Sequence, residues 1–244
     1  MVNAIDRDRI TSVLERGDLD VELQPICDLR GGTRIGYEVL ARFYVEPQWS
    51  PDVWFRSAAA VGLGEELELL AVRTAVDLLD ELPDDTTISI NVSPTVAASY
   101  DLLRLVAPVA ERVILEVTEH AQINDYISLQ KSLRRLRTYG ARLAVDDVGA
   151  GFATLRHILG LCPDLMKLDV SLIRDIDGDP WRRALAASLV TFAHEIDATI
   201  VAEGIETVAE FELLRELGIR YGQGFYLGRP QPLLTALTST MSMN

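Results

Sequence analysis

Acidic and amide side chains stand at the ends of short apolar, β-branched runs along this sequence. They are Glu38, Asn91, Glu116, Glu119, Asp146, Asp147, Asp169 and Glu203, and Lys167 stands among them. One such carboxylate by itself usually caps the next helix or pairs with a lysine. Several that converge on one rim would repel one another and raise their pKa values unless a cation neutralised them. Because Mg²⁺ and Mn²⁺ prefer oxygen ligands, the set predicts a site for divalent ions.

Asp146 and Asp147 are adjacent, and neighbouring residues of a regular strand point to opposite faces. We therefore expect Asp147 to lie past the end of its strand. There Gly149 and Gly151 would let the backbone turn sharply and bring the carboxylate back to the site. Two ions about 4 Å apart, bridged by a carboxylate, would bind a phosphodiester, generate hydroxide from water and stabilise both oxygens of an in-line displacement.

The elements that must position these residues are repeated βα units. Strand candidates are residues 21–29, 34–43, 87–93, 113–119, 142–148, 165–170, 199–205 and 221–227, and helical patterns lie between them. The first two flank Gly31 and Gly32 and predict a hairpin, so one strand is antiparallel. Eight strands at this length predict an α/β fold, a (β/α)8 TIM-like barrel with functional groups at the C-terminal ends of its strands. We expect one domain over residues 1–244, a barrel core at about 20–232, and a loosely held tail after Pro232.

Composition limits the partners. Of the 244 residues 48% are hydrophobic, which suits one large core, and 37 acidic against 23 basic residues give a formal charge of −14. Such a surface repels polymeric nucleic acid and anionic membranes, although a compact phosphate ligand stays compatible if bound cations neutralise it. Cys27 and Cys162 form no disulfide framework or zinc ribbon, and no apolar run reaches the roughly 20 residues that span a bilayer. We expect a cytoplasmic protein without membrane insertion.

The motifs follow the pattern of a known family. Residues 38–42, EVLAR, resemble the signature that names the EAL phosphodiesterases. The rest of that family's pattern follows in order: ELQPI with Gln24, NVSP from Asn91, LEVTE from Leu115, DDVGAGFATL from Asp146, MKLD with Lys167, VAEGIE with Glu203 and GQGFYLGRP with Gln223. The resemblance covers nearly the whole chain and implies metal-dependent hydrolysis of cyclic di-GMP to linear pGpG.

The resemblance also implies a role for each residue. Glu38, Asn91, Glu116 and Asp146 resemble the ligands of one metal ion, and Asp146 would bridge to a second ion held by Asp147 and Glu203. The two ions would be Mg²⁺ or Mn²⁺. Lys167 would contact the catalytic water or phosphate, so the catalytic set is Lys167, Glu38, Asp146 and Glu203. Gln24, Leu40, Arg42, Asp169, Glu206 and Gln223 resemble positions on the substrate side, and Glu119 resembles a residue that supports the ligands.

Lys167 and Arg42 also have a structural interpretation, in which each forms an ion pair that supports the fold. Lys167 and Asp169 share one strand face at positions i and i+2, which is compatible with a barrel-interior ion pair. Arg42 is either a phosphate ligand, which suits a guanidinium, or a partner for a neighbouring acid.

The chain departs from the family pattern at Val39 and in the loop after Asp147, at Val148, Ala150, Phe152 and Ala153. In the family this loop links the metal site to a dimer interface. The changes therefore bear on regulation more than on activity. We expect a homodimer, and a regulatory domain or partner outside this chain.

A catalytically silent receptor for cyclic di-GMP, acting through a protein partner, is the alternative from another class. The intact acids and Lys167 argue against it. A barrel enzyme that enolises its substrate with Mg²⁺ and a lysine is more remote. His120, His157 and His194 show no metal-ligand spacing, and the arginines of 134–137 are typical of a solvated helix face.

Overall fold

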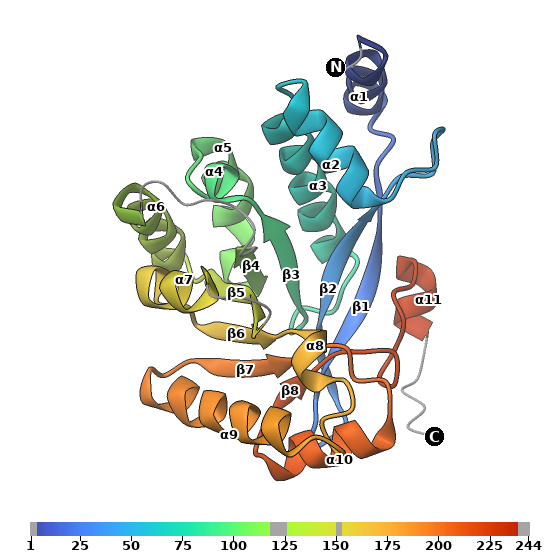
Figure 1. Ribbon diagram of the computed structural model, residues 1–244. Coiled ribbons are helices and arrows are strands. Elements are labelled where there is room, and N and C mark those ends of the chain that lie inside the picture. The colour runs from blue at the N-terminus through green and yellow to red at the C-terminus, as the bar shows by residue number, and fades with distance from the viewer. Residues whose placement is uncertain (1–3, 118–125, 150–152, 239–244) are drawn as a thin grey trace.

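The eight predicted strands close into a barrel (Figure 1). The structure, a computed structural model, describes residues 4–117, 126–149 and 153–238. The strands are β1 (Asp20–Asp28), β2 (Arg34–Arg42), β3 (Thr87–Val92), β4 (Val113–Val117), β5 (Arg142–Val148), β6 (Leu165–Leu168), β7 (Thr199–Ala202) and β8 (Tyr221–Gly222). Each lies within one predicted run or overlaps it to within a residue. The (β/α)8 TIM-like architecture is therefore confirmed.

One strand runs against the others. β1 pairs antiparallel with both β2 and β8, whereas the pairs from β2 to β8 are all parallel. The predicted hairpin between β1 and β2 is confirmed. Because a hairpin supplies no crossover helix, the outer face of β1 is covered from the far end of the chain by α11 (Leu233–Thr238). Tyr37 and Arg34 both donate to the Ala236 carbonyl, at 3.2 and 3.1 Å. The segment after Pro232, expected to be loosely held, is thus partly an anchored helix.

Helices surround the barrel. They are α1 (Ala4–Arg16), α2 (Pro51–Ala60), α3 (Gly64–Asp77), α4 (Pro94–Ala97), α5 (Tyr100–Val106), α6 (Tyr126–Thr138), α7 (Ala153–Leu161), α8 (Val170–Ile173), α9 (Pro180–Glu195) and α10 (Val208–Glu216), with 3₁₀ turns at Leu78–Asp80 and Ala107–Arg112. Their starts follow local chemistry, since Ser93, Asp179 and Thr207 accept backbone N–H groups at the first turns of α4, α9 and α10. Within the described ranges, no helix combines the length and apolar character needed to cross a bilayer.

The barrel interior is layered. An apolar plug of Ile26, Ile114, Ala144, Leu165 and Val201 fills it toward the N-terminal ends of the parallel strands. Side chains two residues further along a strand face the same way, one layer higher. That step leads from the plug to Glu116, Asp146, Lys167 and Glu203. The plug therefore forms an apolar floor beneath the charged layer.

Candidate active site

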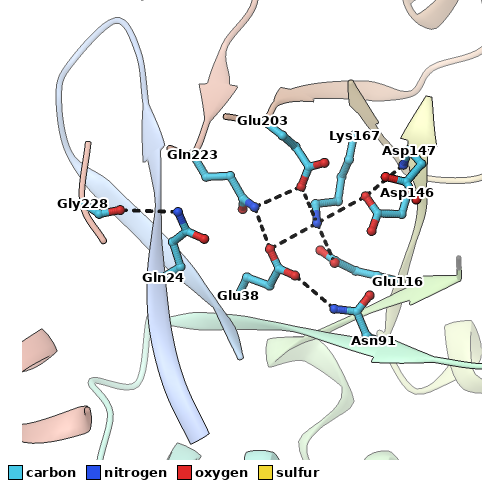
Figure 2. A network of polar contacts seen from close by, with 10 residues as sticks. All are labelled: Gln24, Glu38, Asn91, Glu116, Asp146, Asp147, Lys167, Glu203, Gln223 and Gly228. Carbon is cyan, nitrogen blue, oxygen red and sulfur yellow. Dashed lines mark hydrogen bonds and ion pairs between the residues drawn. The ribbon is translucent and has the colours of Figure 1, made fainter. Parts of the chain in front are cut away.

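The ammonium group of Lys167 lies at the centre of the charged layer (Figure 2). Its Nζ is 2.7 Å from a carboxylate oxygen of Glu116 and of Glu203, 3.3 Å from Glu38 and 3.4 Å from Asp146. These acids come from four different strands or strand ends, and Lys167 is 1% exposed. The predicted convergence of strand-end acids at one mouth is thus present in the structure.

Lys167 forms no ion pair with Asp169, contrary to the expectation that these two side chains pair inside the barrel. The Asp169 carboxylate instead accepts the Ser171 N–H at 2.9 Å and caps α8. β6 ends at Leu168, so Asp169 already belongs to the turn, where the two-residue alternation of a strand no longer holds.

Burial and charge oppose each other in this site: burial raises the pKa of Glu203 and Glu116, whereas for Glu38 burial is outweighed by Lys167 and the amides of Gln223 and Asn91, which lower its pKa. Burial raises the pKa of Glu203 to about 8, an effect that Lys167 opposes and that Asp146 and Glu38 reinforce. Burial also raises the pKa of Glu116 well above its ordinary value. For Lys167, burial is outweighed by the surrounding carboxylates, which raise its pKa so that it stays charged. One cation among four acids leaves an excess of negative charge, which a divalent ion would neutralise.

Two amide side chains orient the acids. Asn91 donates to Glu38 at 3.0 Å, and the Gln223 amide nitrogen donates to Glu38 at 2.6 Å and to Glu203 at 3.0 Å. The Oε1 atom of Gln223 is buried, with no hydrogen-bond partner among the described residues. Gln223 therefore lies between two of the expected metal ligands. The resemblance had placed it on the substrate side only.

Asp147 reaches the site by a different route from the one expected. β5 continues to Val148, and its pairing with β6 is irregular between Val145 and Val148. Within that irregularity Asp147 has φ of 56°, a left-handed conformation that aspartate tolerates better than most residues. Oxygen atoms of Asp146, Asp147 and Glu203 consequently lie within 4.8 Å of one another. The expectation that Asp147 lies past the strand end is wrong, because a bulge inside the strand turns its side chain.

Glu38 is also not at a strand end. It lies in the middle of β2, which pairs with β3 only as far as Val39 and continues with β1 to Arg42. The hairpin partner extends β2 beyond its pairing with β3, and Glu38, which pairs with Ser89, still reaches the Asn91 side chain near the end of β3.

A cavity of about 590 Å³ opens beside Asn91, between the ends of β2 and β3 and helices α2 and α3. Leu40 and Arg42 line it. The guanidinium of Arg42 pairs with Glu22 at 2.7 Å across the hairpin. The interpretation of Arg42 as the partner of a neighbouring acid is therefore confirmed. Gln24 donates to the Gly228 carbonyl at 3.4 Å, which ties β1 to the segment after β8.

Asp169 and Glu206 lie outside both the network around Lys167 and the lining of the cavity beside Asn91. Glu206 is exposed at 43% of its side chain and pairs with Arg174 at 3.2 Å, and Asp169 caps α8. Glu119 lies outside the described residues.

The donor set fits divalent metal ions. Asp146, Asp147 and Glu203 offer clustered carboxylate oxygens, and Glu38, Asn91 and Glu116 adjoin them with further hard oxygen donors. The unpaired Oε1 of Gln223 adds a buried acceptor within this set. Among the described residues neither a histidine nor a cysteine belongs to this set, which disfavours zinc.

Comparisons with known proteins identify relatives of similar sequence and fold. Cyclic di-GMP phosphodiesterase PdeF from Escherichia coli K12 is 29% identical over 242 residues, covering 94% of this chain and 32% of that protein. The manganese and cyclic di-GMP complex of BlrP1 from Klebsiella pneumoniae is 30% identical, with a TM-score of 0.78 over 88% of this chain and 56% of that one. An EAL domain protein from Listeria monocytogenes shares the fold, with a TM-score of 0.84, 24% identity and coverage of 95% and 97%.

This chain corresponds to only part of several relatives, spanning 31%, 32% and 45% of the length of three of them. The family model for the EAL domain matches residues 7–230, nearly the whole sequence. With its barrel, its converging acids and its central lysine, the chain belongs to the EAL domain family.

Proposed function

We propose that this chain hydrolyses cyclic di-GMP to linear pGpG with two divalent ions, Mg²⁺ or Mn²⁺. The observation that carries the proposal is the meeting of Glu38, Glu116, Asp146 and Glu203 around Lys167 above an apolar floor. Relatives and structural neighbours that act on or bind cyclic di-GMP support the choice of substrate.

The residues divide the work by position. Glu38, Asn91, Glu116 and Asp146 would hold one ion, and Asp147 and Glu203 would hold a second together with Asp146. Bound ions would supply an activated water and neutralise charge on the phosphodiester. Lys167 contributes a fixed positive charge next to the phosphate, and Gln223 orients Glu38 and Glu203 by hydrogen bonds.

The substrate would approach over the cavity beside Asn91. Leu40 and Arg42 line that cavity and are proposed contacts for the dinucleotide, together with Gln24 and Gln223. Asp169 and Glu206 lie on the other side of the mouth, in the turns after β6 and β7. We retain both as proposed residues of the substrate side.

A direct assay tests the proposal. The purified protein is incubated with cyclic di-GMP and Mn²⁺, the products are separated by chromatography, and Glu38→Ala and Lys167→Ala are run alongside. Linear pGpG should form with the parent and almost none with either variant. Glu195→Ala, an exposed acid on α9, is the control and should keep parental turnover. Binding of cyclic di-GMP without turnover under Mg²⁺ or Mn²⁺ would favour the silent receptor instead.

We also propose that the protein works as a cytoplasmic homodimer and that a domain or partner outside this chain controls it. The family resemblance supports both proposals. This chain spans 31% and 32% of the length of two relatives, so those relatives contain further sequence. Light scattering on the purified protein tests the dimer, and a monomer at micromolar concentration would contradict it.

A further inference from the structure

One buried carboxylate lies outside the network around Lys167. Glu210, in the first turn of α10, is 3% exposed. Its Oε1 accepts the Asp175 N–H at 3.0 Å, and its Oε2 accepts the N–H groups of Glu206 at 2.8 Å and Thr207 at 2.9 Å. A buried carboxylate needs such donors, since an uncompensated charge would be costly. Three backbone N–H groups therefore compensate the charge of Glu210, as the Lys167 ammonium group does in part for the acids of the active site.

These donors belong to two different turns. Asp175 lies in the segment that follows β6 and contains Asp169, and Glu206 and Thr207 lie in the segment that follows β7 and starts at Glu203. Glu210 makes a hydrogen bond to the first segment that the helix cap alone does not require. In Figure 1 the first segment, which includes α8, lies at the same end of the barrel as the end of β7.

Further contacts join the same two segments. Arg174 pairs with Glu206 at 3.2 Å on the exposed side. Gly204 has φ of 68°, and a Cβ there would overlap the side chain of Val170, so the two backbones are closely packed. Glu210 is the buried member of this set of contacts.

The segment after β7 bears directly on the active site. The Glu203 N–H donates to the Leu168 carbonyl at 3.0 Å, at the start of the first segment, and the Ile205 N–H donates to the Gln223 carbonyl at 3.1 Å. Glu203 and Gln223 are therefore held by the same stretch of backbone that Glu210 fastens. A displacement of this stretch would move the Glu203 carboxylate away from Asp146 and Asp147.

We propose that Glu210 is a positioning residue for the metal site, which it controls by fastening the Glu203 segment to the segment after β6. This rests on the proposed role of Glu203 as a metal ligand. Groups that orient ligands from behind commonly change metal affinity by about 10- to 100-fold when they are removed. The role is separate from capping α10, which Thr207 and Glu210 perform together.

Glu210→Gln separates the two roles. A carboxamide has one oxygen, so it can accept from Glu206 and Thr207 and keep the cap, while its NH₂ group faces the Asp175 N–H and loses that bond. Thr207→Ala is the matched control, because it removes the N-cap hydroxyl from the same helix and leaves the Asp175 contact in place.

The experiment measures binding of Mn²⁺ alone. The electron paramagnetic resonance signal of free Mn²⁺ gives the unbound concentration. We expect Glu210→Gln to bind Mn²⁺ about tenfold more weakly than the parent, and Thr207→Ala to bind within about twofold of it. Equal weakening in both variants would overturn the proposal, because it would mean that any loosening of α10 has the same effect. Unchanged affinity in Glu210→Gln would overturn it too.

Amide hydrogen exchange supplies a second measurement. The Asp175 amide should exchange faster in Glu210→Gln and at the parental rate in Thr207→Ala, and parental exchange in both would contradict the fastening. If Glu210→Gln does not fold, Glu210→Asp keeps the charge and shortens the reach to Asp175 by one methylene. That variant must then show the weaker Mn²⁺ binding. Since Mn²⁺ binding needs no turnover, failure of this proposal is distinguishable from failure of the proposed hydrolysis.

Discussion

The molecule buries carboxylates in two ways at the same end of the barrel. Around Lys167, four acids share one side-chain cation, and burial raises the pKa of Glu203 to about 8. At Glu210, one acid is surrounded by three backbone N–H groups on two segments. The first arrangement has more negative charge than its cation can offset. In the second, the carboxylate charge of Glu210 is compensated by backbone N–H groups that the fold holds in place.

The difference separates chemistry from support. Backbone donors are fixed by the fold, so the Glu210 site has nothing to gain from an added ion. The acids around Lys167 repel one another, and a divalent ion would relieve that repulsion. Four predictions test this contrast, from the largest expected effect to the smallest.

Lys167→Met should have the largest effect, because it leaves Glu38, Glu116, Asp146 and Glu203 without their shared cation. We expect a loss of about 3–5 kcal/mol in the free energy of unfolding without divalent ions. Mn²⁺ should then restore more stability to this variant than it adds to the parent. Urea unfolding with and without Mn²⁺ measures both quantities. Parental stability in the metal-free variant would contradict the central role of the lysine.

Glu210→Ala should destabilise the protein by about 2–4 kcal/mol, because it leaves three backbone N–H groups near α10 without their acceptor. In contrast to Lys167→Met, Mn²⁺ should not make up this loss. The same urea series measures it. Rescue by Mn²⁺ to the parental value would erase the distinction between the two sites.

Mn²⁺ should stabilise the parent by about 2.7 kcal/mol when it is present at about 100 times its Kd, because it binds the folded state only. Thermal unfolding at several Mn²⁺ concentrations measures the shift, and Glu38→Gln is the control that should show much less of it. An unfolding temperature that does not depend on Mn²⁺ would rule out a metal site at these acids.

Proton release from Glu203 should make Mn²⁺ affinity depend on pH. Because its pKa is raised from 4.5 to about 8, chiefly by burial, Mn²⁺ must displace a proton below that pH. Affinity should rise by at least about tenfold per pH unit up to pH 8, because Glu116, whose pKa burial also raises, must release its proton as well. The free energy of unfolding of the metal-free protein should fall as the pH rises from 4.5 to 8. In this range the folded state keeps a proton on Glu203 that the unfolded chain has released. Constant Mn²⁺ affinity across this range would contradict the raised pKa.

Much of this arrangement could be predicted from local pattern. Strand positions followed from short β-branched runs, and the expected ligands Glu116, Asp146 and Glu203 followed from polar residues where those runs end. Such features depend on neighbours within a few residues. Glu210 gave no comparable signal, because a glutamate three residues after a threonine indicates a helix cap and nothing more.

The sequence by itself determined which side chains are available and which positions of one regular strand share a face, since alternation along a strand is a local property. Tertiary structure decided how they are used. It assigned Lys167 to four acids instead of Asp169, turned Asp147 inward through a bulge against β6, and joined Arg42 to Glu22 across the hairpin. The physical reason is that these contacts depend on the register and relative height of strands distant in sequence, which only the closed barrel establishes.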